Sequence, residues 1–319
     1  MSTTSLRRFR WYGRVLATDL PFVVRLPEAL GEADVTLKRV EDSAWPAGGI
    51  ESGRRIFPAD PKPGDDSWLE AFVEGDRHRL CCVGRVHFEI LGNRIEWRLL
   101  GGTPSEAEAF FLGLVSALWL EMNGALCLHG AAVVTSLGAV GFLGFNRAGK
   151  SSLAASFLTE GGALLTDDVL ALDVEPSRIV ARPGFPQIRL WPASAEALVG
   201  DARELEPVHP DFDKRRVPIG PQGLGEFHDR PEQLRALFLP DRTGEVVSLS
   251  RISPRDAAIE LVRHSFLGAL GEAAIGVASR FERIVAVSER VPVFRLTYPN
   301  GLERLGSVRR AITECLETL

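Results

Sequence analysis

One short segment of the chain has the residue types and the spacing of a phosphate-binding loop. It fits the pattern G-x-x-x-x-G-K-[ST] and reads Gly144-Phe145-Asn146-Arg147-Ala148-Gly149-Lys150-Ser151. In such a loop the backbone N–H groups and the N-terminus of the following helix point positive partial charge at a phosphate chain. The lysine adds a full positive charge, and the serine hydroxyl suits a magnesium ion. We therefore predict nucleotide contacts from Gly144, Asn146, Arg147, Ala148, Gly149, Lys150, Ser151 and Ser152.

The residues on either side of this loop predict the strand and the helix that it needs. Residues 139–143 are apolar and few, as in a buried strand, and residues 152–158 suit a helix. Lysine occurs at only four positions of the chain. A chance match to the pattern is therefore rare, at about one in a few hundred chains of this composition.

Two adjacent carboxylates form the second chemical feature. Asp167 and Asp168 end the short run 164–166, and 168 − 150 = 18 residues separate Asp168 from Lys150. That distance leaves room for one helix and a return strand. At a strand end both side chains can turn into one crevice, where one carboxylate holds magnesium and the other takes a proton from an attacking hydroxyl. A solvated Asp-Asp turn is the alternative interpretation.

His129 is the third candidate, between Leu128 and Gly130. Its apolar neighbours are typical of a buried, hydrogen-bonded histidine. Its position one predicted strand pair ahead of the loop also suits a role in the site. There it would hold the phosphate region or orient one of the aspartates.

The bulk composition is that of an ordinary soluble protein. The chain has 319 residues, of which 45% are apolar and 25% charged, so it can bury a substantial core. A net charge of −5 gives no reason to expect nucleic-acid binding. The cysteines show no zinc-binding spacing and are expected to be reduced thiols; they are Cys81, Cys82, Cys127 and Cys315. No signal-peptide core follows the basic residues near the start, so we expect a cytoplasmic protein.

One uncharged stretch is long enough to cross a bilayer. Residues 124–145 contain no Asp, Glu, Lys or Arg. They include polar residues and several glycines, and they lead directly into the loop. Two buried strands joined by a turn at 136–138 explain the stretch better than a membrane span.

The first part of the chain predicts a β-rich domain over residues 1–105. Its strand candidates are residues 11–17, 33–38, 68–74, 78–83, 85–91 and 94–99, the last four forming an antiparallel meander. His78 and His87 are expected on the solvent side of this meander, and residues 58–67 are expected to form an exposed loop. A helix follows to about residue 122, with Thr103 as N-cap and Glu106 three residues later. Because this helix is apolar nearly all round, we expect residues 106–123 to be a buried connection between two domains.

Residues 124–319 predict a second domain of alternating strands and helices. Strand candidates are 126–128, 131–135, 139–143, 164–166, 169–174, 179–181, 234–239, 246–252 and 293–298. Helices are expected over 194–199, from Ser253 as an N-cap, over 281–288 and over 302–319. Residues 208–228 are polar and turn-rich, which predicts a surface excursion or a mobile loop near the site.

The three features together resemble a known family. In order and rough spacing, Leu128-His129-Gly130, the 144–151 loop and Asp167-Asp168 are similar to the catalytic domain of HPr kinase/phosphorylase, a compact relative of the ATP-dependent phosphoenolpyruvate carboxykinase core. The resemblance implies an α/β (α+β) kinase core that uses ATP and Mg²⁺. It also implies that Ser151 and Asp167 hold the metal and that Asp168 is the base toward an acceptor serine, with His129 nearby.

A subgroup of that family resembles more of the chain. The β-rich first part and the segments 183–186, 190–192 and 291–296 look like HPr-kinase-related proteins of bacterial biosynthetic clusters, some of which phosphorylate a terminal serine of lasso-peptide precursors. Two features depart from HPr kinases. Arg147 stands where a glycine is usual, and the Arg-Gly segment that handles HPr has no clear copy. Arg189 and Lys214 are candidates to replace its phosphate contact.

We therefore expect a serine kinase whose acceptor is a peptide or protein, without nucleic-acid or membrane partners. A small-molecule kinase or carboxykinase-like enzyme is an alternative, since acceptor choice lies in loops that the sequence does not place. A regulator that binds ATP without turnover is a second alternative. A homo-oligomer is possible on the resemblance alone.

Overall fold

The computed structural model describes residues 6–41, 53–59, 68–200, 203–209 and 212–319. It is a mixed α/β structure whose contacts divide the chain into two compact units. The first comprises Met1–Asn123 and Leu267–Ser279, and the second comprises Gly124–Phe266 and Arg280–Leu319. The sequence-based boundaries differ in treating residues 106–123 as a separate connection and in placing 267–279 with the second domain.

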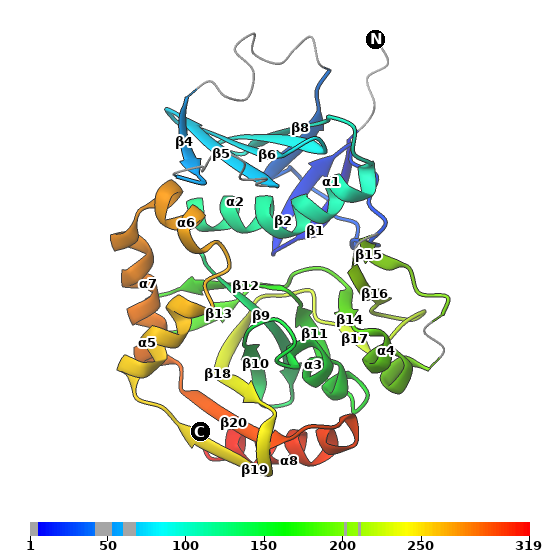
Figure 1. Cartoon of the computed structure of the whole chain (residues 1–319), viewed down its shortest axis with the longest axis vertical. Coiled ribbons are helices and arrows are strands. Elements are labelled where there is room, and N and C mark those ends of the chain that lie inside the picture. The colour runs from blue at the N-terminus through cyan, green and yellow to red at the C-terminus, as the bar shows by residue number, and fades with distance from the viewer. Residues whose placement is uncertain (1–5, 42–52, 60–67, 201–202, 210–211) are drawn as a thin grey trace. The chain divides into compact units, whose positions relative to one another are not determined.

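The first unit is built on one large sheet. Its strands are β1 (Arg7–Trp11), β2 (Arg14–Thr18), β3 (Val35–Arg39), β4 (Arg54–Phe57), β5 (Leu69–Glu74), β6 (Arg77–Cys82), β7 (Val86–Leu91) and β8 (Arg94–Leu99). Their order among the described residues is β1-β2-β3-β8-β7-β6-β5-β4 (Figure 1). The predicted antiparallel meander over β5–β8 is confirmed. β3 adds a feature that the sequence did not indicate, because it pairs in parallel with both β2 and β8. The expected loop at 58–67 falls largely outside the described residues.

The strand predicted over residues 11–17 is confirmed only over 14–17, which belong to β2. The chain turns at Tyr12 and Gly13, with φ of 48° and 71°, so that β1 and β2 form a hairpin. Positive φ at both central residues gives the twist that a two-residue hairpin needs. Asparagine or aspartate usually occupies the first of these positions, and a tyrosine there hides the turn in the sequence.

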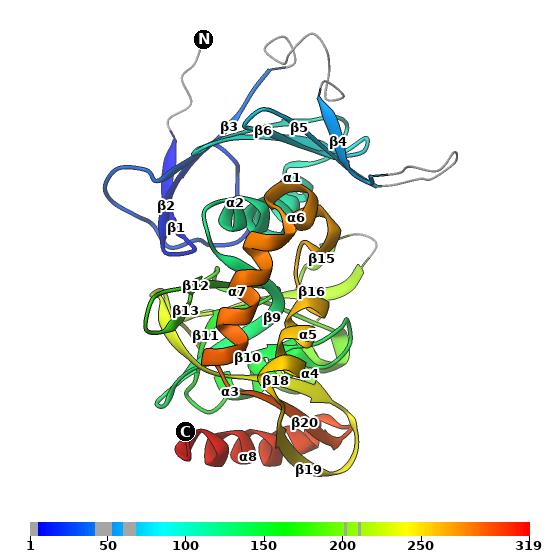
Figure 2. The same ribbon diagram turned by 90° about the vertical axis from the view of Figure 1, so that its left-hand side faces the viewer.

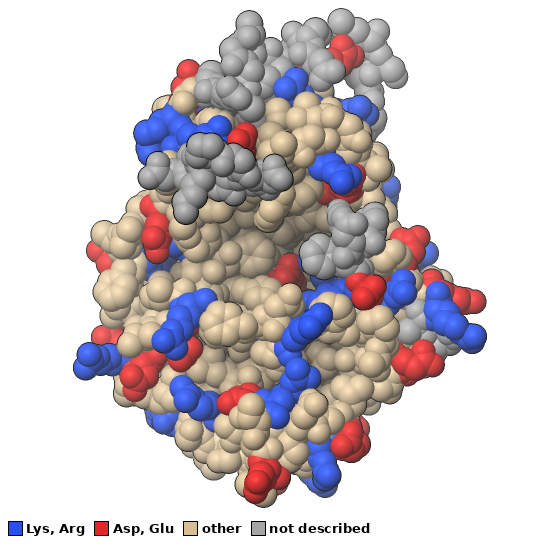
Figure 3. Space-filling view, in the orientation of Figure 1, with Lys and Arg blue, Asp and Glu red and all other residues tan. Residues whose placement is uncertain are grey.

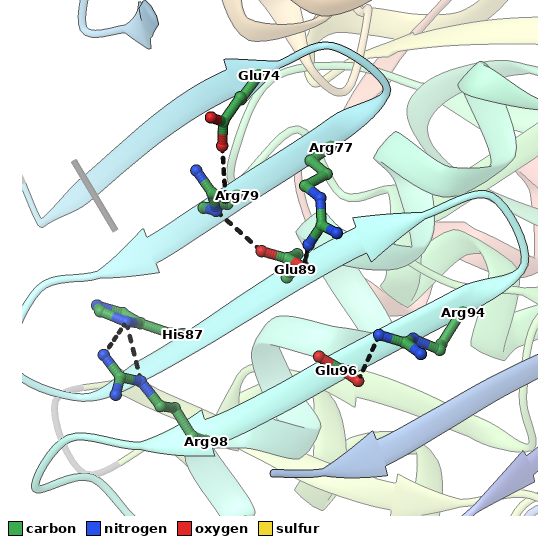
Figure 4. Close-up of polar contacts among 8 residues, drawn as sticks. All are labelled: Glu74, Arg77, Arg79, His87, Glu89, Arg94, Glu96 and Arg98. Carbon is green, nitrogen blue, oxygen red and sulfur yellow. Dashed lines mark hydrogen bonds and ion pairs between the residues drawn. The ribbon is translucent and has the colours of Figure 1, made fainter. Parts of the chain in front are cut away.

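The expectation that His78 and His87 face solvent is also wrong, since both are buried. His87 lies 2.7 Å from Cys81 Sγ through Nε2 and contacts Arg98 through Nδ1. On the same strands Arg79 is buried between two carboxylates, with Glu89 at 2.9 Å and Glu74 at 2.8 Å (Figure 4). Alternating polar residues therefore mark a buried, paired layer here, which strand periodicity alone does not distinguish from a solvated face.

The helix predicted after Thr103 exists but is interrupted. Its N-terminal capping box is confirmed: Glu106 N–H donates to Thr103 Oγ1 at 3.3 Å, and Thr103 N–H donates to Glu106 Oε2 at 2.7 Å. α1 (Pro104–Phe110) runs into one π-helical turn, η2 (Phe111–Val115), and then α2 (Ser116–Met122). At that turn the Ser116 hydroxyl donates to the Phe111 carbonyl and accepts from Trp11 Nε1. The apolar helix thus packs on the first unit's own sheet. α6 (Gly268–Ile275), which the sequence did not predict, contacts α2 and β4.

The second unit is a sheet with helices on both faces. Its strands are β9 (Leu126–Thr135), β10 (Gly138–Leu143), β11 (Ala163–Thr166), β12 (Val169–Val174), β13 (Ile179–Ala181), β17 (Glu226–Phe227), β18 (Glu232–Asp241), β19 (Thr243–Arg251) and β20 (Val293–Pro299). β10 pairs in parallel with β18, which pairs in parallel with β20. α3 (Lys150–Leu158) and α8 (Leu305–Glu317) share one core with one face of these strands. α5 (Pro254–Arg263) and α7 (Val277–Arg290) contribute to the core on the opposite face (Figures 1 and 2).

The uncharged stretch 124–145 forms the hairpin of β9 and β10, as predicted. Among the described residues no helix is both long enough and apolar enough to cross a bilayer. On the face that Figure 3 shows, the described basic and acidic side chains are interspersed over the second unit. That mixture is typical of an ordinary hydrated surface.

The segment 208–228 is more regular than the excursion or mobile loop that the sequence predicts. Apart from residues 210–211, which lie outside the described ranges, it contains the end of β15 (Pro207–His209), β16 (Phe212–Pro218) and β17. β16 pairs antiparallel with β14 (Gln187–Leu190) in a small separate sheet. Val217 from β16 joins the core of α3, which explains why the polar segment is held in place.

The burial of His87 predicts that the first unit is less stable in acid. Burial lowers the pKa of His87 to about 4, and the charge of Arg98 adds to this fall. An unfolded chain takes up a proton at this residue below about pH 6.5, whereas the folded unit does not until about pH 4. The free energy of unfolding should therefore decrease as pH falls from 6.5 to 4, by up to about 3 kcal/mol from His87.

Urea unfolding followed by tryptophan fluorescence at several pH values measures this loss. His87→Gln should flatten the dependence between pH 6.5 and 4, while His228→Gln in the other unit serves as the control. Equal slopes for the wild type and His87→Gln would contradict the assignment.

Candidate active site

The 144–151 loop connects the central strand β10 to α3, both of which are fixed by packing. β10 is paired on both sides, by β9 and by β18, so the start of the loop has little freedom. Gly149 is the N-cap of α3, has φ of 96°, and offers no side-chain acceptor to the first N–H groups of the helix. Unsatisfied N–H groups at a helix N-terminus are a ready partner for an anion.

Close packing explains the glycines of the loop, and the arginine between them has a special conformation. A Cβ at Gly144 would lie 2.8 Å from the Cβ of Ala148, and one at Gly149 would lie 3.1 Å from the Tyr298 hydroxyl. Arg147 has a left-handed φ of 67°, at a cost of about 1–2 kcal/mol for a residue with a side chain. Its guanidinium lies 5.0 Å from the centre of the Trp191 ring. The side chain therefore lies along the wall of a cavity next to the loop.

Lys150 is buried at the centre of the cluster. Its Nζ donates to the carbonyls of Gly144 at 2.7 Å and Phe145 at 3.1 Å, and lies 3.1 Å from His129 Nε2. Burial lowers the pKa of Lys150 to about 8; the negative charges of Asp167 and Asp168 oppose that fall. The ammonium group is thus held against the start of the loop.

Ser151 and Asp167 are the two oxygen donors that could hold a metal. Ser151 Oγ donates to Asp167 Oδ1 at 2.8 Å, and the other carboxylate oxygen accepts from the Arg189 N–H at 2.8 Å. Burial raises the pKa of Asp167, and the neighbouring charge of Asp168 raises it further. Octahedral magnesium at 2.0–2.1 Å holds adjacent ligands about 2.9 Å apart, so this pair fits two neighbouring positions of the ion. Such a site takes its other ligands from water and phosphate.

Asp168 is held by two partners and a left-handed backbone. Its Oδ2 accepts from Arg189 Nη1 at 2.7 Å, its Oδ1 lies 3.3 Å from His129 Nδ1, and its φ is 78°. Burial alone would raise the pKa of Asp168, but Arg189 and His129 outweigh it and hold the pKa well below the usual range. His129 touches Asp168 with one nitrogen and Lys150 with the other. The histidine thus links the carboxylate pair to the loop.

Strand register explains why these groups meet. Val169, the residue after the carboxylates, pairs with His129 across β12 and β9. The turn itself is fixed because Thr166 Oγ1 donates to the Val169 carbonyl at 2.7 Å. All three predicted catalytic residues therefore lie together with Lys150 and Ser151, although their roles remain predictions. Ser152 lies beside them and shares a 2.8 Å hydrogen bond with Ser194.

Two cavities flank the cluster. The first, of about 480 Å³, is lined by the loop, by the start of α3 and by the ends of β18 and β20. The second, of about 380 Å³, lies on the side of Asp168 and is lined by His129, Phe145, Asp168, Arg263, His264 and Phe266, among others. Both volumes are in the ~300–1,000 Å³ range of small-molecule sites. The carboxylate cluster thus has space for one ligand on each side.

Among the residues of the first cavity that sequence reasoning missed are Trp191, Arg242 and Tyr298. Arg242 donates to the Arg147 carbonyl, and the buried Tyr298 hydroxyl has no hydrogen-bond partner among the described residues. Arg242 follows β18, and Tyr298 is near the end of β20. β18 pairs in parallel with β10, and β20 pairs in parallel with β18. The carboxyl ends of parallel strands lie at the same edge of a sheet, and the 144–151 loop follows the carboxyl end of β10. A prediction of this parallel pairing could therefore have identified Arg242 and Tyr298 as neighbours of the loop.

Gly184 packs against Thr166, the residue before the two aspartates, so a substitution at Gly184 tests how rigid this turn is. A Cβ at this glycine would lie 3.1 Å from Thr166 Cβ and closer still to its hydroxyl. We expect Gly184→Ala to destabilise the second unit by about 1–3 kcal/mol through overpacking. Gly306→Ala in α8 is the matched control, since a Cβ there meets nothing within 4 Å. Urea unfolding measures both, and equal stability of the two variants would show that the turn can yield.

Comparison with known proteins adds little. No protein-family model matches the chain, and no curated protein sequence matches it. Among solved structures, the chain is similar to the Hpr(Ser) kinase/phosphatase from Coxiella burnetii, with a TM-score of 0.30 and 12% sequence identity. The match covers 60% of this chain and 97% of the other. A TM-score this low carries no argument about fold or activity, so the site geometry must carry any functional conclusion.

Proposed function

We propose that the chain is a kinase that transfers the γ-phosphoryl group of ATP to a serine hydroxyl of a peptide or protein, with Mg²⁺ as the metal. The observation that carries this proposal is the single cluster of Lys150, Ser151, Asp167 and Asp168 at the N-terminus of α3. Ser151 Oγ and Asp167 Oδ1 are 2.8 Å apart, as two magnesium ligands should be. The predicted resemblance to HPr kinases led to the same roles.

The two cavities support a two-substrate reaction. The first contains the loop, Lys150 and Ser151, and suits the nucleotide. The second contains Asp168 and His129 and suits the acceptor. Bound magnesium would offset negative charge on the phosphates, with Ser151 and Asp167 as its protein ligands. In this proposal Asp168, which lines the second cavity, faces the acceptor hydroxyl.

The transfer itself needs little covalent chemistry from the protein. The acceptor oxygen forms a bond to the γ-phosphorus while the bond from that phosphorus to the bridging oxygen breaks, and ADP leaves with the electron pair. Asp168 accepts the hydroxyl proton. Because Arg189 and His129 keep this carboxylate ionised, it can accept a hydrogen bond from the hydroxyl throughout. In a loose transition state such orientation matters more than strong basicity.

Asp168→Asn is the sharpest test of the catalytic assignment. Asparagine has the same shape and tolerates the left-handed φ of 78°, so the turn should persist. We expect transfer to fall by about 10²–10⁴-fold while ATP binding stays within a few-fold. Radiolabel transfer from ATP to serine-containing peptides, with alanine-substituted peptides as blanks, measures the first quantity, and calorimetry measures the second. Asp173→Asn, which removes an ion pair with Arg182 elsewhere on β12, is the control. Full transfer by Asp168→Asn would refute its role as base.

The metal ligands have a separate signature. Ser151→Ala and Asp167→Asn should each raise the Mg²⁺ concentration for half-maximal transfer by about tenfold or more, because the first removes an oxygen ligand and the second removes the negative charge of the other ligand. Ser307→Ala on α8 is the control for the serine change. A magnesium titration of initial rates at saturating ATP measures the effect. An unchanged magnesium dependence in both variants would place the metal elsewhere.

A further inference from the structure

Lys214 is the remaining lysine of the second unit, and strand register directs it toward the site. β14 and β16 pair with Arg189 opposite Arg216 and Leu190 opposite Arg215. One step further along the same register, Trp191 comes opposite Lys214. Opposed residues of an antiparallel pair share a face, and successive residues alternate. Arg189, Trp191 and Lys214 therefore share one face.

The opposite face of this ribbon is anchored. Ile188, Leu190 and Val217 are buried in the core that includes α3. The other face carries Arg189, which is bonded to Asp168, and Lys214, whose charge acts on Asp167 and Asp168. Lys214 Nζ lies 5.7 Å from the centre of the Trp191 ring, so the lysine rests against that ring. The side chain is thereby directed rather than loose in solvent.

The position of Lys214 relative to the two cavities is unusual. Of the described residues that line either cavity, Lys214 and Asn146 alone line both. Lys214 is thus the one cation at the boundary between the space assigned to the nucleotide and the space assigned to the acceptor. A phosphoryl group that passes from one substrate to the other must cross this boundary.

The neighbouring cations already have partners. The Arg189 guanidinium is bonded to Asp168 at 2.7 Å, and Lys150 donates to two carbonyls of the loop. Arg147 lies over Trp191. In the described part of the chain, the Lys214 ammonium has no hydrogen bond and no ion pair; it lies against the Trp191 ring, and its charge acts on Lys150, Asp167 and Asp168. It is therefore free to bind a new anion without breaking an existing polar contact.

We propose that Lys214 is a further catalytic residue, whose ammonium group contacts the phosphoryl group during its transfer; this proposal rests on the proposed kinase function. In the transition state negative charge is spread over three equatorial oxygens of that group. A fixed cation at the boundary stabilises this charge more than it stabilises bound ATP, because the equatorial oxygens reach it only in transit. The bond changes and the proton transfer to Asp168 are those already given.

The test compares Lys214→Met, which keeps the length and removes the charge, with Lys214→Arg, which keeps the charge. Lys38→Met in the first unit is the matched control, and thermal melts establish that each variant is folded. We expect Lys214→Met to lower kcat by about 10²–10³-fold with the Kd for Mg-ATP within about threefold, and Lys214→Arg to recover most of the loss. An unchanged kcat, or a loss confined to ATP affinity, would overturn the proposal.

A second measurement keeps the two proposals distinguishable. ADP with magnesium and aluminium fluoride mimics the planar phosphoryl group without any acceptor. Wild type should bind ADP at least tenfold more tightly when aluminium fluoride is present, and Lys214→Met should lose that gain. If wild type shows the gain but transfers to no peptide, only the serine acceptor is wrong, and Lys214 is still decided by its variant. If wild type shows no gain and no transfer, both proposals fail. A gain of equal size in Lys214→Met overturns the role of Lys214 alone.

Discussion

The arrangement of the candidate site depends on one strand that changes partners along its length. The first residues of β9 pair with β12, and the later ones pair with β10 on one side and β11 on the other. The change occurs at Gly130, where a Cβ would lie 2.7 Å from a Leu143 methyl and 2.8 Å from the Phe142 carbonyl. Only a residue without a side chain lets the strands approach there. His129, one residue earlier, is therefore held at the fork, beside the start of β12.

The charged side chains of the site contact one another in series, starting from His129. Asp168 contacts His129 and Arg189, and His129 contacts Lys150. A buried charge is tolerated only where such partners compensate its lost hydration. The two adjacent carboxylates consequently differ: burial and repulsion raise the pKa of Asp167, while its basic partners lower that of Asp168. Identical residue types thus acquire different chemistry from their surroundings, which suits one to a metal and the other to a hydroxyl.

Residue patterns within short segments correctly predicted the strands and helices that carry the site. Features that depend on pairing between distant segments were not predicted. The apolar run before Gly144, the capping box at Thr103 and the aspartate pair each depend on neighbours in sequence, and each indicated the element that the structure contains. The hairpin at Tyr12 was missed because the turn lacks its usual residues. His78 and His87 were placed wrongly because a period of two does not reveal which face is covered. Trp191 and Arg242 were missed because they are distant in sequence from the 144–151 loop.

The pair of cavities has a consequence for the order of events in catalysis. Among the described residues that line them, they share only Asn146 and Lys214, so most of the wall of each cavity is its own. For the proposed transfer between two substrates, separate cavities would let either substrate bind first and either product leave first. Direct transfer across the shared boundary also requires both substrates to be present at once. For the proposed kinase, this arrangement predicts a random sequential mechanism, in which neither ADP nor the modified acceptor blocks the exit of the other.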